Sequence, residues 1–531
     1  MAGRLATPAA LLAVAAALLV PSASAKSPWA ADLSAISRGL DRAVAAGHLD
    51  EDTAASYREI AGRASTALPR LPSSRYRNLS AVVHEVAVQA RLYDQPRGYA
   101  LFSMLNFNVR WLGEHWDRPA GTDIIDTDGV LYRAFPGIGF QFHPLGNFGR
   151  LNWLIGSRRD ERAERLAEEL VQRGVARTGG LAWEYYFRFS GGRPPWISGM
   201  AQAVAAQALS RVGKRLERPD ILAAAGRAYA TVPKLLRVVA GRPWIRLYAF
   251  SGETVLNAQL QSIVSLQDFF AQTGDARAQE LADRLQSAAT ALLPRFDTGS
   301  WSRYSLGGPE STLDYHRFVV KLLKLLVART SDPVLTAYST KFGAYLTEPP
   351  VVEAGRSPEP VYPWPADGFR DEARISFWIS KRSNVRVVVG DGRTKPVRVP
   401  RGWNTIPWRP GAVEPGTYLS TLHAVDIAGN SSETELAPVV VRRDTTPPRL
   451  NAAVRKARVY WRALDRETPW LSLRLVLRRG GEVRTLSLGR RWLHGSAALK
   501  VPRGAWSGTL VASDSSGNSA AAAVGLVRGR G

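Results

Sequence analysis

Cysteine is absent from this sequence of 531 residues. Its absence excludes disulfides, thiol nucleophiles and cysteine metal ligands, so the fold has to be stabilised by burial of a core. The seven histidines are scattered and form no His-x-x-x-His or His/Glu cluster, which argues against a zinc centre. Gly137-Ile138-Gly139 lacks the third glycine and the downstream acid of a dinucleotide fingerprint. No Gly-x-Ser-x-Gly element points to an esterase. We therefore predict no metal site.

Long hydrophobic runs are also scarce. The one clear run, from Ala9 to Val20, follows Arg4 and precedes the small residues Ser22-Ala23-Ser24-Ala25. It is shorter than the roughly 20 residues that span a bilayer. Residues 1–25 are therefore predicted to be a signal peptide, with a mature protein that starts near Lys26 and is secreted or associated with the cell envelope. A retained membrane anchor is the alternative.

Negative charge is in short supply. The chain has 70 Lys and Arg against 46 Asp and Glu, and residues 351–531 hold 29 of the basic and 15 of the acidic residues. A net charge of +24 favours an anionic partner. Acidic polysaccharide, a wall polymer, anionic lipid and nucleic acid all fit the charge, and genomic base bias explains part of it. Charge alone does not choose among them. The prediction of acidic polysaccharide rather than nucleic acid rests on the family resemblance given below, with attachment to the envelope as an option. The sequence predicts no oligomeric state.

Apolar residues recur with helical spacing from Ser27-Pro28, a helix start, to about Pro349. Paired helices with short glycine- or proline-marked links predict an α/α barrel, or toroid, over residues 26–348, with a cleft at one end. The predicted helices cover residues 31–46, 51–67, 79–92, 98–114, 147–156, 160–174, 200–212, 219–239, 255–274, 276–293, 315–329 and 334–346.

A proline-rich linker over residues 349–366 ends the helical pattern. Beyond it, alternating apolar residues predict two all-β sandwich modules, at 367–443 and 444–531. The second repeats features of the first, since Asp514-Ser515-Ser516-Gly517-Asn518 echoes Asp426-Ile427-Ala428-Gly429-Asn430. These modules resemble bacterial immunoglobulin-like modules. An Asp-x-x-Gly-Asn element can offer oxygens to calcium, although a tight turn is the simpler explanation.

Tyrosines cluster near the middle of the chain. Phe296-Asp297-Thr298-Gly299-Ser300-Trp301-Ser302-Arg303-Tyr304 runs into Asp314-Tyr315-His316, just before a predicted helix. A phenol, with an ordinary pKa of about 10, exchanges protons with carbon only in a tuned environment. In a sugar-binding cleft such a cluster favours carbanion chemistry over hydrolysis by paired carboxylates.

Five segments in this order resemble the C-terminal domain of D-glucuronyl C5-epimerases, over about residues 130–346. They are Gly139-Phe140-Gln141-Phe142-His143-Pro144, Pro195-Trp196-Ile197-Ser198-Gly199-Met200-Ala201-Gln202, Val255-Leu256-Asn257, Phe296 to Leu306, and Asp314-Tyr315-His316. The resemblance implies an α/α barrel that binds a uronic-acid polysaccharide. It also implies inversion of C5 of glucuronic acid units without an organic cofactor.

By the same resemblance the catalytic tyrosines are Tyr304, Tyr315 and Tyr248. Two positions depart from the family, because Leu247 replaces a glutamate and Gly307 an arginine. Glu253, Glu184, Arg246 and Arg303 are near enough in sequence to substitute for the missing charges. The predicted substrate-binding residues are His316, Arg303, Asn257, Trp196, His143 and Arg246.

Each of these residues also has a purely structural interpretation. The buried phenol of Tyr304 can form a hydrogen bond within a turn. Tyr315 and Tyr248 can belong to the core, and His316 can form a hydrogen bond with the backbone at a helix start. Asn257 can be a partnered polar residue of an apolar helix, and aromatic residues such as Trp196 can build the barrel wall.

The primary prediction is a secreted isomerase that epimerises C5 of uronic-acid polysaccharide by removal and return of a proton. A polysaccharide lyase on the same substrate class shares the carbanion intermediate and is the first alternative. The second alternative is a surface protein that binds the polysaccharide without turnover, which the replacements at Leu247 and Gly307 favour.

Overall fold

A computed structural model describes residues 29–177 and 179–529. The predicted signal peptide and the helix start at Ser27-Pro28 lie outside the described residues. Contacts divide the chain into two compact units, with the boundary between Leu346 and Thr347. The first unit is mainly helical and the second is built of β-strands.

The helices of the first unit overlap every helical segment that the sequence predicts. One prediction ran too far: residues 219–239 form a helix only to Thr231, after which Pro233 opens a 3₁₀ turn that leads into a strand. The α-helices are α1 (Trp29–Ala45), α2 (Glu51–Ala67), α3 (Ser73–Val88), α4 (Gln95–Glu114), α5 (Pro144–Gly156), α6 (Asp160–Gln172), α7 (Gly199–Arg215), α8 (Pro219–Thr231), α9 (Leu256–Thr273), α10 (Ala276–Leu292), α11 (Leu313–Val327) and α12 (Pro333–Ala344). The 3₁₀ turns are η1 (Leu68–Arg70), η2 (Val232–Leu235) and η3 (Leu293–Phe296).

Capping residues fix where the helices next to the site begin and end. The Ser198 side chain accepts a hydrogen bond from the backbone of Ala201 at the start of α7, and Thr312 caps α11 by accepting one from Tyr315. Such caps satisfy backbone donors that a helix start leaves unpaired. Gly274 ends α9 in the left-handed conformation, at φ 71°.

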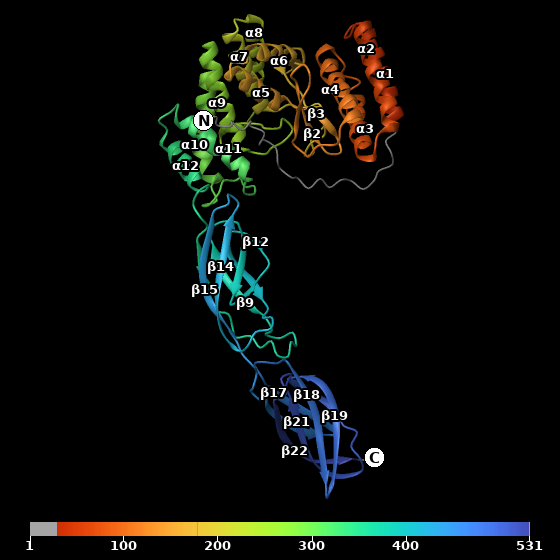
Figure 1. Cartoon of the computed structure of the whole chain (residues 1–531), viewed down its shortest axis with the longest axis vertical. Helices are drawn as coiled ribbons and strands as arrows, with labels where there is room; N and C mark the ends of the chain where they lie inside the picture. The colour runs from red at the N-terminus through yellow and green to blue at the C-terminus, as the bar shows by residue number, and fades with distance from the viewer. Residues whose placement is uncertain (1–28, 178, 530–531) are drawn as a thin grey trace. The chain divides into compact units, whose positions relative to one another are not determined.

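Many helices of this unit pack against the next but one along the chain. Figure 1 shows α1 to α4 gathered on one side and α9 to α12 on the other, with α5 to α8 between them. Contacts join α5 to α7, α7 to α9 and α9 to α11. At the contact between α7 and α8, a Cβ on Gly213 would lie 2.7 Å from the backbone nitrogen of Leu222, so only glycine allows this approach.

Short strands occupy the loops between these helices, and the sequence did not predict them. The three-stranded sheet is β1 (Asp123–Ile125), β2 (Leu131–Phe135) and β3 (Gly139–Phe142). Two hairpins are β4 (Val175–Arg177) with β5 (Gly180–Ala182), and β6 (Leu236–Val239) with β7 (Arg242–Ile245).

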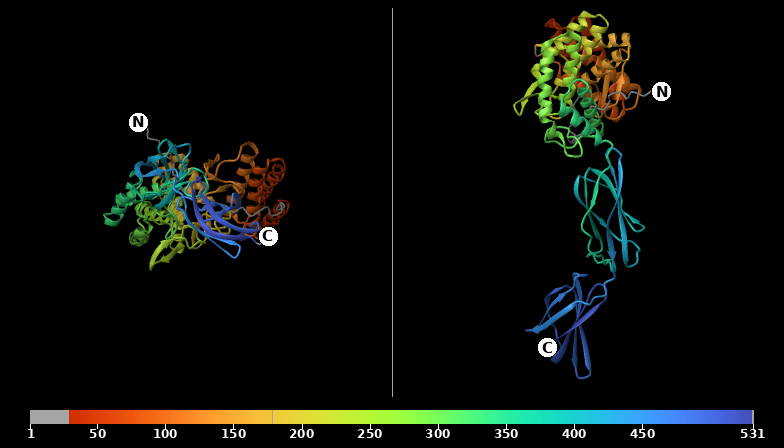
Figure 2. Two further views of the ribbon diagram at one scale, coloured as in Figure 1. Left: turned by 90° about the horizontal axis from the view of Figure 1, so that it is seen from below. Right: turned by 90° about the vertical axis from the view of Figure 1, so that its left-hand side faces the viewer.

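The second unit contains two sets of strands, drawn in cyan and in blue in Figure 2. In each set, two antiparallel sheets share one apolar core. The first set is β8 (Val352–Ala354), β9 (Ala373–Ile379), β10 (Ser383–Val389), β11 (Gly392–Arg393), β12 (Val397–Val399), β13 (Gly402–Trp408), β14 (Gly416–Asp426) and β15 (Ser431–Val441). The second is β16 (Arg449–Arg455), β17 (Arg458–Leu464), β18 (Trp470–Arg479), β19 (Glu482–Trp492), β20 (His494–Ala498), β21 (Gly504–Ser513) and β22 (Ser519–Gly529).

A β-rich region after a helical one agrees with the predicted order of fold classes. In the part of the chain that the structure describes, no helix combines the length and the apolar character needed to cross a membrane.

Candidate functional site

The structure brings the three predicted catalytic tyrosines together. Tyr248 follows β7, Tyr304 lies in the loop of residues 297–312, and Tyr315 belongs to the first turn of α11. The ring centroids of Tyr304 and Tyr315 are 4.8 Å apart. The phenols of Tyr248 and Tyr304 lie close enough for each to shift the pKa of the other. Three segments that are distant in sequence thus contribute one cluster of phenols.

Tyr315 uses its hydroxyl to join two backbone segments. The hydroxyl donates to the carbonyl oxygen of Tyr304 at 3.0 Å and accepts from the backbone nitrogen of Asn257 at 2.9 Å. Tyr315 is buried, and burial raises the pKa of its phenol well above 10. The side-chain oxygen of Asn257 is buried without a hydrogen-bond partner. Tyr315 therefore ties the start of α9 to the loop that carries Tyr304.

Tyr304 is the more acidic of the two other phenols. Burial raises the pKa of Tyr304 to about 12, against the hydrogen bond from Tyr248, which lowers it, while Glu253 nearby raises it further. Burial and then the charge on Tyr304 raise the pKa of Tyr248 well above 10. A proton would therefore leave Tyr304 before it leaves Tyr248, and Tyr248 would donate a hydrogen bond to the phenolate.

The side chains considered as substitutes for the missing family charges have other contacts. Glu184 is fully buried between Arg97, at 2.8 Å, and Arg177, at 2.5 Å. The Arg246 guanidinium donates to the carbonyl of Ala249, and that of Arg303 to the carbonyl of Gly308. Glu253 is exposed and close enough to the tyrosines to affect their pKa.

The two replaced positions also have structural roles. Leu247 lines the aromatic pocket beside Tyr248, and Gly307 has φ 75°, a conformation that favours glycine over arginine.

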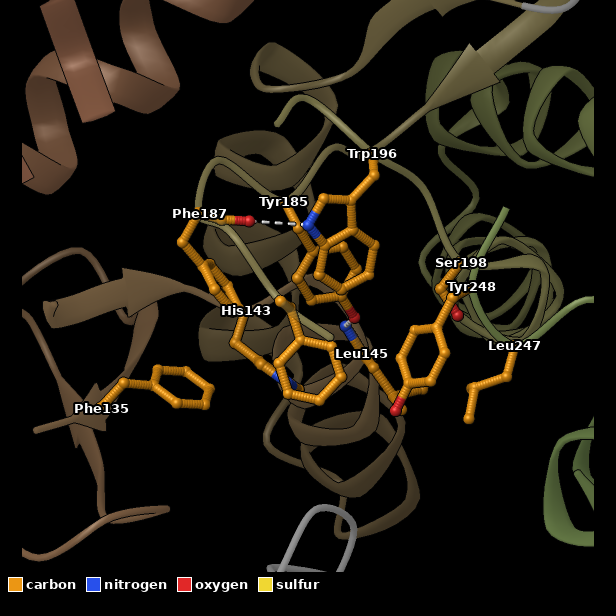
Figure 3. Close-up of a pocket in the computed structure, with 10 residues that line it drawn as sticks. Phe135, His143, Leu145, Tyr185, Phe187, Trp196, Ser198, Leu247 and Tyr248 are labelled. Carbon is orange, nitrogen blue, oxygen red and sulfur yellow. Dashed lines mark hydrogen bonds between the residues drawn. The ribbon is translucent and has the colours of Figure 1, made fainter. Parts of the chain in front are cut away.

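An aromatic pocket borders Tyr248 (Figure 3). Trp196 stacks face to face on Tyr185 with centroids 4.1 Å apart, and its indole nitrogen donates to the carbonyl of Phe187 at 2.8 Å. Trp196 also meets Tyr248 edge on, at 5.7 Å between centroids. The cavity measures only about 10 Å³, which is the space of about one water molecule. The pocket is a packed aromatic wall rather than a sugar subsite.

His143 lies in the wall between this pocket and a much larger cleft, and lines both. Its Nδ1 accepts a hydrogen bond from the backbone of Gly146 at the start of α5. Burial is the main reason that the pKa of His143 lies well below 6.5, so the ring is neutral and its proton is assigned to Nε2. Nε2 is buried without a partner. The Nε2–H group of His143 is thus an unpaired donor between the aromatic pocket and the large cleft.

His316 packs in the core of the helical unit. It is fully buried, stacks on Trp301 at 3.9 Å between centroids, and its Nδ1 lies 2.7 Å from the Ser302 hydroxyl. Its Nε2 lies 2.9 Å from the carbonyl oxygen of Phe342. These are the contacts of a core residue that anchors the loop before α11. The guanidinium groups of Arg246 and Arg303 likewise donate to backbone carbonyls, those of Ala249 and Gly308.

The large cleft has a volume of about 790 Å³ and runs along α5, α7, α9 and α11. Cationic side chains outnumber anionic ones in its wall. Arg133 pairs with Asp123 at 2.6 Å and Arg329 with Asp268 at 2.8 Å. The other basic residues of the wall form no ion pair within residues 29–177 and 179–529, and they are Arg150, Arg211 and Lys321.

A polar network crosses the floor of the cleft. The amide of Gln207 donates to Asp268 at 2.5 Å, and its oxygen accepts from Asn152 and from Ser265. Asn152 in turn accepts from Arg211 at 3.0 Å. The network connects α5, α7 and α9, so it fixes the positions of charged groups that a ligand in the cleft would meet.

The sequence did not single out these cleft residues. Gln207 and Arg211 are four residues apart on α7, and Gln261 and Asp268 are seven apart on α9, so each pair lies on one helical face. Polar residues that recur on the inward face of otherwise apolar helices are the signal that could have identified them.

Part of the helical unit matches a family model. Residues 179–344 match the model described as D-glucuronyl C5-epimerase C-terminus. The resemblance is confirmed for this segment. It includes the three tyrosines and Trp196, whereas His143 precedes the matched residues. The immunoglobulin-like resemblance of the second unit stays a prediction.

Comparisons with whole proteins add only remote likenesses. No curated protein matches the chain significantly. An endo-β-1,4-glucanase from an Achatina fulica gut metagenomic library is 17% identical, with TM-score 0.33 over 42% of this chain and 76% of that one. A D-mannose isomerase is 10% identical, with TM-score 0.32 over 61% and 87%. The unsaturated glucuronyl hydrolase of Bacillus sp. GL1 is 13% identical, with TM-score 0.28 over 60% and 83%. Likenesses this remote say nothing further about this chain.

Proposed function

We propose that the helical unit is a carbohydrate-active isomerase that binds uronic-acid polysaccharide in the large cleft and epimerises C5 of its uronate units. One observation carries the proposal. Tyr248 lines the aromatic pocket beside Tyr304, and this pocket shares His143 and Leu145 with a cleft that has an excess of cationic side chains. The match of residues 179–344 to the epimerase family supports the same reaction.

In the proposed reaction the C5–H bond of a glucuronate unit breaks and its electron pair moves into the adjacent carboxylate. Tyr304, as phenolate, takes the proton, because its pKa is the lower of the pair and Tyr248 donates a hydrogen bond to its oxygen. Basic residues of the cleft stabilise the charge that develops on the carboxylate, and the unpartnered Nε2 of His143 is a further donor. The electron pair then returns to C5 and forms a bond to a proton that water delivers on the opposite face, and Tyr304 gives the proton it took to the hydroxide that remains.

A polysaccharide-binding protein without turnover is the second candidate, and two observations favour it. The Tyr304 pKa of about 12 leaves little phenolate at neutral pH. The described hydrogen bonds of Arg246 and Arg303 go to the backbone carbonyls of Ala249 and Gly308. The aromatic pocket also has no room for a sugar ring. Proton abstraction at neutral pH would need a cation beside Tyr304 to lower its pKa, and an anionic polysaccharide does not bring one.

We further propose that the helices form an α/α barrel and that the two sets of strands are immunoglobulin-like modules. In a secreted protein these basic modules would attach the enzyme to the envelope or to the polymer. The shared core of each pair of sheets supports the modular interpretation.

Incubation with glucuronate-containing polymers in heavy water tests the proposal. Epimerisation predicts deuterium at C5 together with a new C5 configuration. An ultraviolet absorbance from an unsaturated uronate would instead identify a lyase. Saturable binding without either signal would identify the binding protein, and no binding to any acidic polymer would reject both candidates.

A further inference from the structure

Three carboxylates converge at one end of the second β-sandwich. Asp444 precedes β16, Asp465 directly follows β17, and Asp514 directly follows β21. One oxygen from each lies within 4.8 Å of the others. Asp444 and Asp514 are only 7% and 6% exposed. Three like charges are therefore held together in a place with little access to water.

Two oxygens of this cluster have no partner. Asp444 accepts a hydrogen bond from Thr446 through Oδ1, and Asp465 accepts from Glu467 and Thr468 through Oδ1. In both residues Oδ2 is buried and unpaired. No lysine or arginine among the described residues forms an ion pair with any of the three carboxylates. A buried, unpaired carboxylate oxygen is costly, so its presence calls for a cation.

The first β-sandwich shows what occupies the equivalent place. Strands β9 and β17 can be aligned so that their buried residues coincide, with Ile379 equivalent to Ala463. In this alignment Lys381 is equivalent to Asp465. The two Asp-x-x-Gly-Asn turns put Asp426 opposite Asp514.

The equivalent turns have the same internal contacts. In each, the first aspartate accepts hydrogen bonds from the backbone and side chain of the final asparagine, Asn430 or Asn518. In the first sandwich, the buried Lys381 places its ammonium 3.3 Å from Asp426 Oδ2. The same ammonium donates to the carbonyl of Glu348. That module therefore carries its own cation.

The second module has a carboxylate where the first has this lysine. Compared with the first module, the second therefore lacks a positive charge and has an additional negative charge beside Asp514. A cation from solution would then neutralise the cluster. We propose that Asp444, Asp465 and Asp514 bind a calcium ion that performs the role of the Lys381 ammonium.

The ligand chemistry favours calcium over other divalent cations. All three side chains offer oxygen, which hard cations prefer, and none offers the nitrogen or sulfur typical of zinc sites. Calcium binds oxygen at about 2.3–2.6 Å, so oxygens up to roughly 5 Å apart can share one ion. Magnesium binds at about 2.0–2.1 Å and would need the oxygens within roughly 4.2 Å.

Calcium at this site would connect the segment before β16 to the loops after β17 and β21. Binding only to the folded form stabilises that form by mass action. The proposed ion is structural, and this inference does not depend on the enzymatic proposal.

The test uses the full-length chain, freed of divalent ions by a chelator and then titrated with calcium chloride. Calorimetry is expected to detect one site with a dissociation constant of about 10⁻³ M or tighter. The unfolding temperature of the β unit is expected to rise with calcium. The variants Asp465→Asn and Asp514→Asn should each weaken binding at least about tenfold. Asp391→Asn, in an exposed turn of the first module, should bind as wild type does.

A second variant keeps the test decisive if Asp465→Asn is poorly folded. Asp465→Lys rebuilds the ion pair of the first module, so it should unfold at a higher temperature than the wild type in chelator and should not respond to calcium. The proposal is overturned if wild type binds no calcium at millimolar concentration. It is equally overturned if Asp465→Lys and Asp514→Asn bind calcium as tightly as wild type, or if magnesium binds more tightly than calcium.

Discussion

The hydroxyl of Tyr315 donates a hydrogen bond to the backbone carbonyl of Tyr304 at 3.0 Å. One of the predicted catalytic tyrosines thus holds the backbone of another in place. The same hydroxyl accepts a hydrogen bond from the backbone nitrogen of Asn257, so it both donates and accepts a hydrogen bond with the backbone. This arrangement separates a positioning phenol, Tyr315, from the pair that interacts through its side chains, Tyr248 and Tyr304.

Removal of the Tyr315 hydroxyl should therefore reduce stability. Tyr315→Phe leaves the buried N–H of Asn257 unpaired, which costs about 1–3 kcal/mol. Urea denaturation of the full chain measures this loss in the helical unit. Tyr460→Phe, at a 43% exposed position of β17, is the matched control and should be neutral. Equal stability of Tyr315→Phe and wild type would refute the positioning role.

Neutral replacements in the cleft should weaken the binding of acidic polysaccharide. Arg150→Gln and Lys321→Gln each remove a cation that has no carboxylate partner among the described residues, so affinity should fall about two- to fivefold at low salt. The difference should shrink as salt screens the charges. Isothermal titration at two ionic strengths measures both effects.

Arg284→Gln is the control for the cleft variants, because Arg284 is exposed on α10 and does not line the cleft. If this variant lost as much affinity as the cleft variants, the charge of the whole protein rather than the cleft would account for binding.

The sequence predicted the helices well because their periodicity and caps are local. Thr312 and Ser198 mark the starts of α11 and α7 within a few residues of the expected positions. The strands β1 to β7 were missed because segments of three to five residues show little periodicity. Their pairing depends on neighbours that only the folded chain supplies.

Site residues that belong to sequence motifs could be predicted, whereas residues that come together only in the folded chain could not. Tyr304 and Tyr315 were found because they lie in recognisable segments of a known family. Arg150 and Arg211 come from helices about 60 residues apart and meet only because α5 packs on α7. The ion pairs of Glu184 were equally out of reach, since its partners belong to other segments. For His316 the structural interpretation, a bond to backbone, agrees with its contact with the carbonyl of Phe342.

Stability of the helical unit should decrease as pH rises from about 5 to about 7. Burial raises the pKa of Glu85 from 4.5 to about 7, so between these values the folded chain holds a proton that the unfolded chain releases. Glu85→Gln removes this dependence. The stability of the variant relative to wild type should rise by about 2–3 kcal/mol between pH 5 and pH 8. Denaturation curves at both pH values measure it.

Glu114→Gln replaces an exposed glutamate at the end of α4 and should show no such change. A Glu85→Gln variant whose advantage was the same at both pH values would show that the carboxyl of Glu85 is already ionised at pH 5.

The most direct measurement follows deuterium at C5 of a glucuronate-containing polymer in heavy water, with wild type, Tyr304→Phe and the Tyr460→Phe control. Wild type and the control are expected to incorporate deuterium at the same rate. Tyr304→Phe should remain folded and lose at least about a hundredfold in rate, as removal of a proton-transfer group does. Exchange by Tyr304→Phe at the wild-type rate would contradict the assignment of Tyr304 as the base.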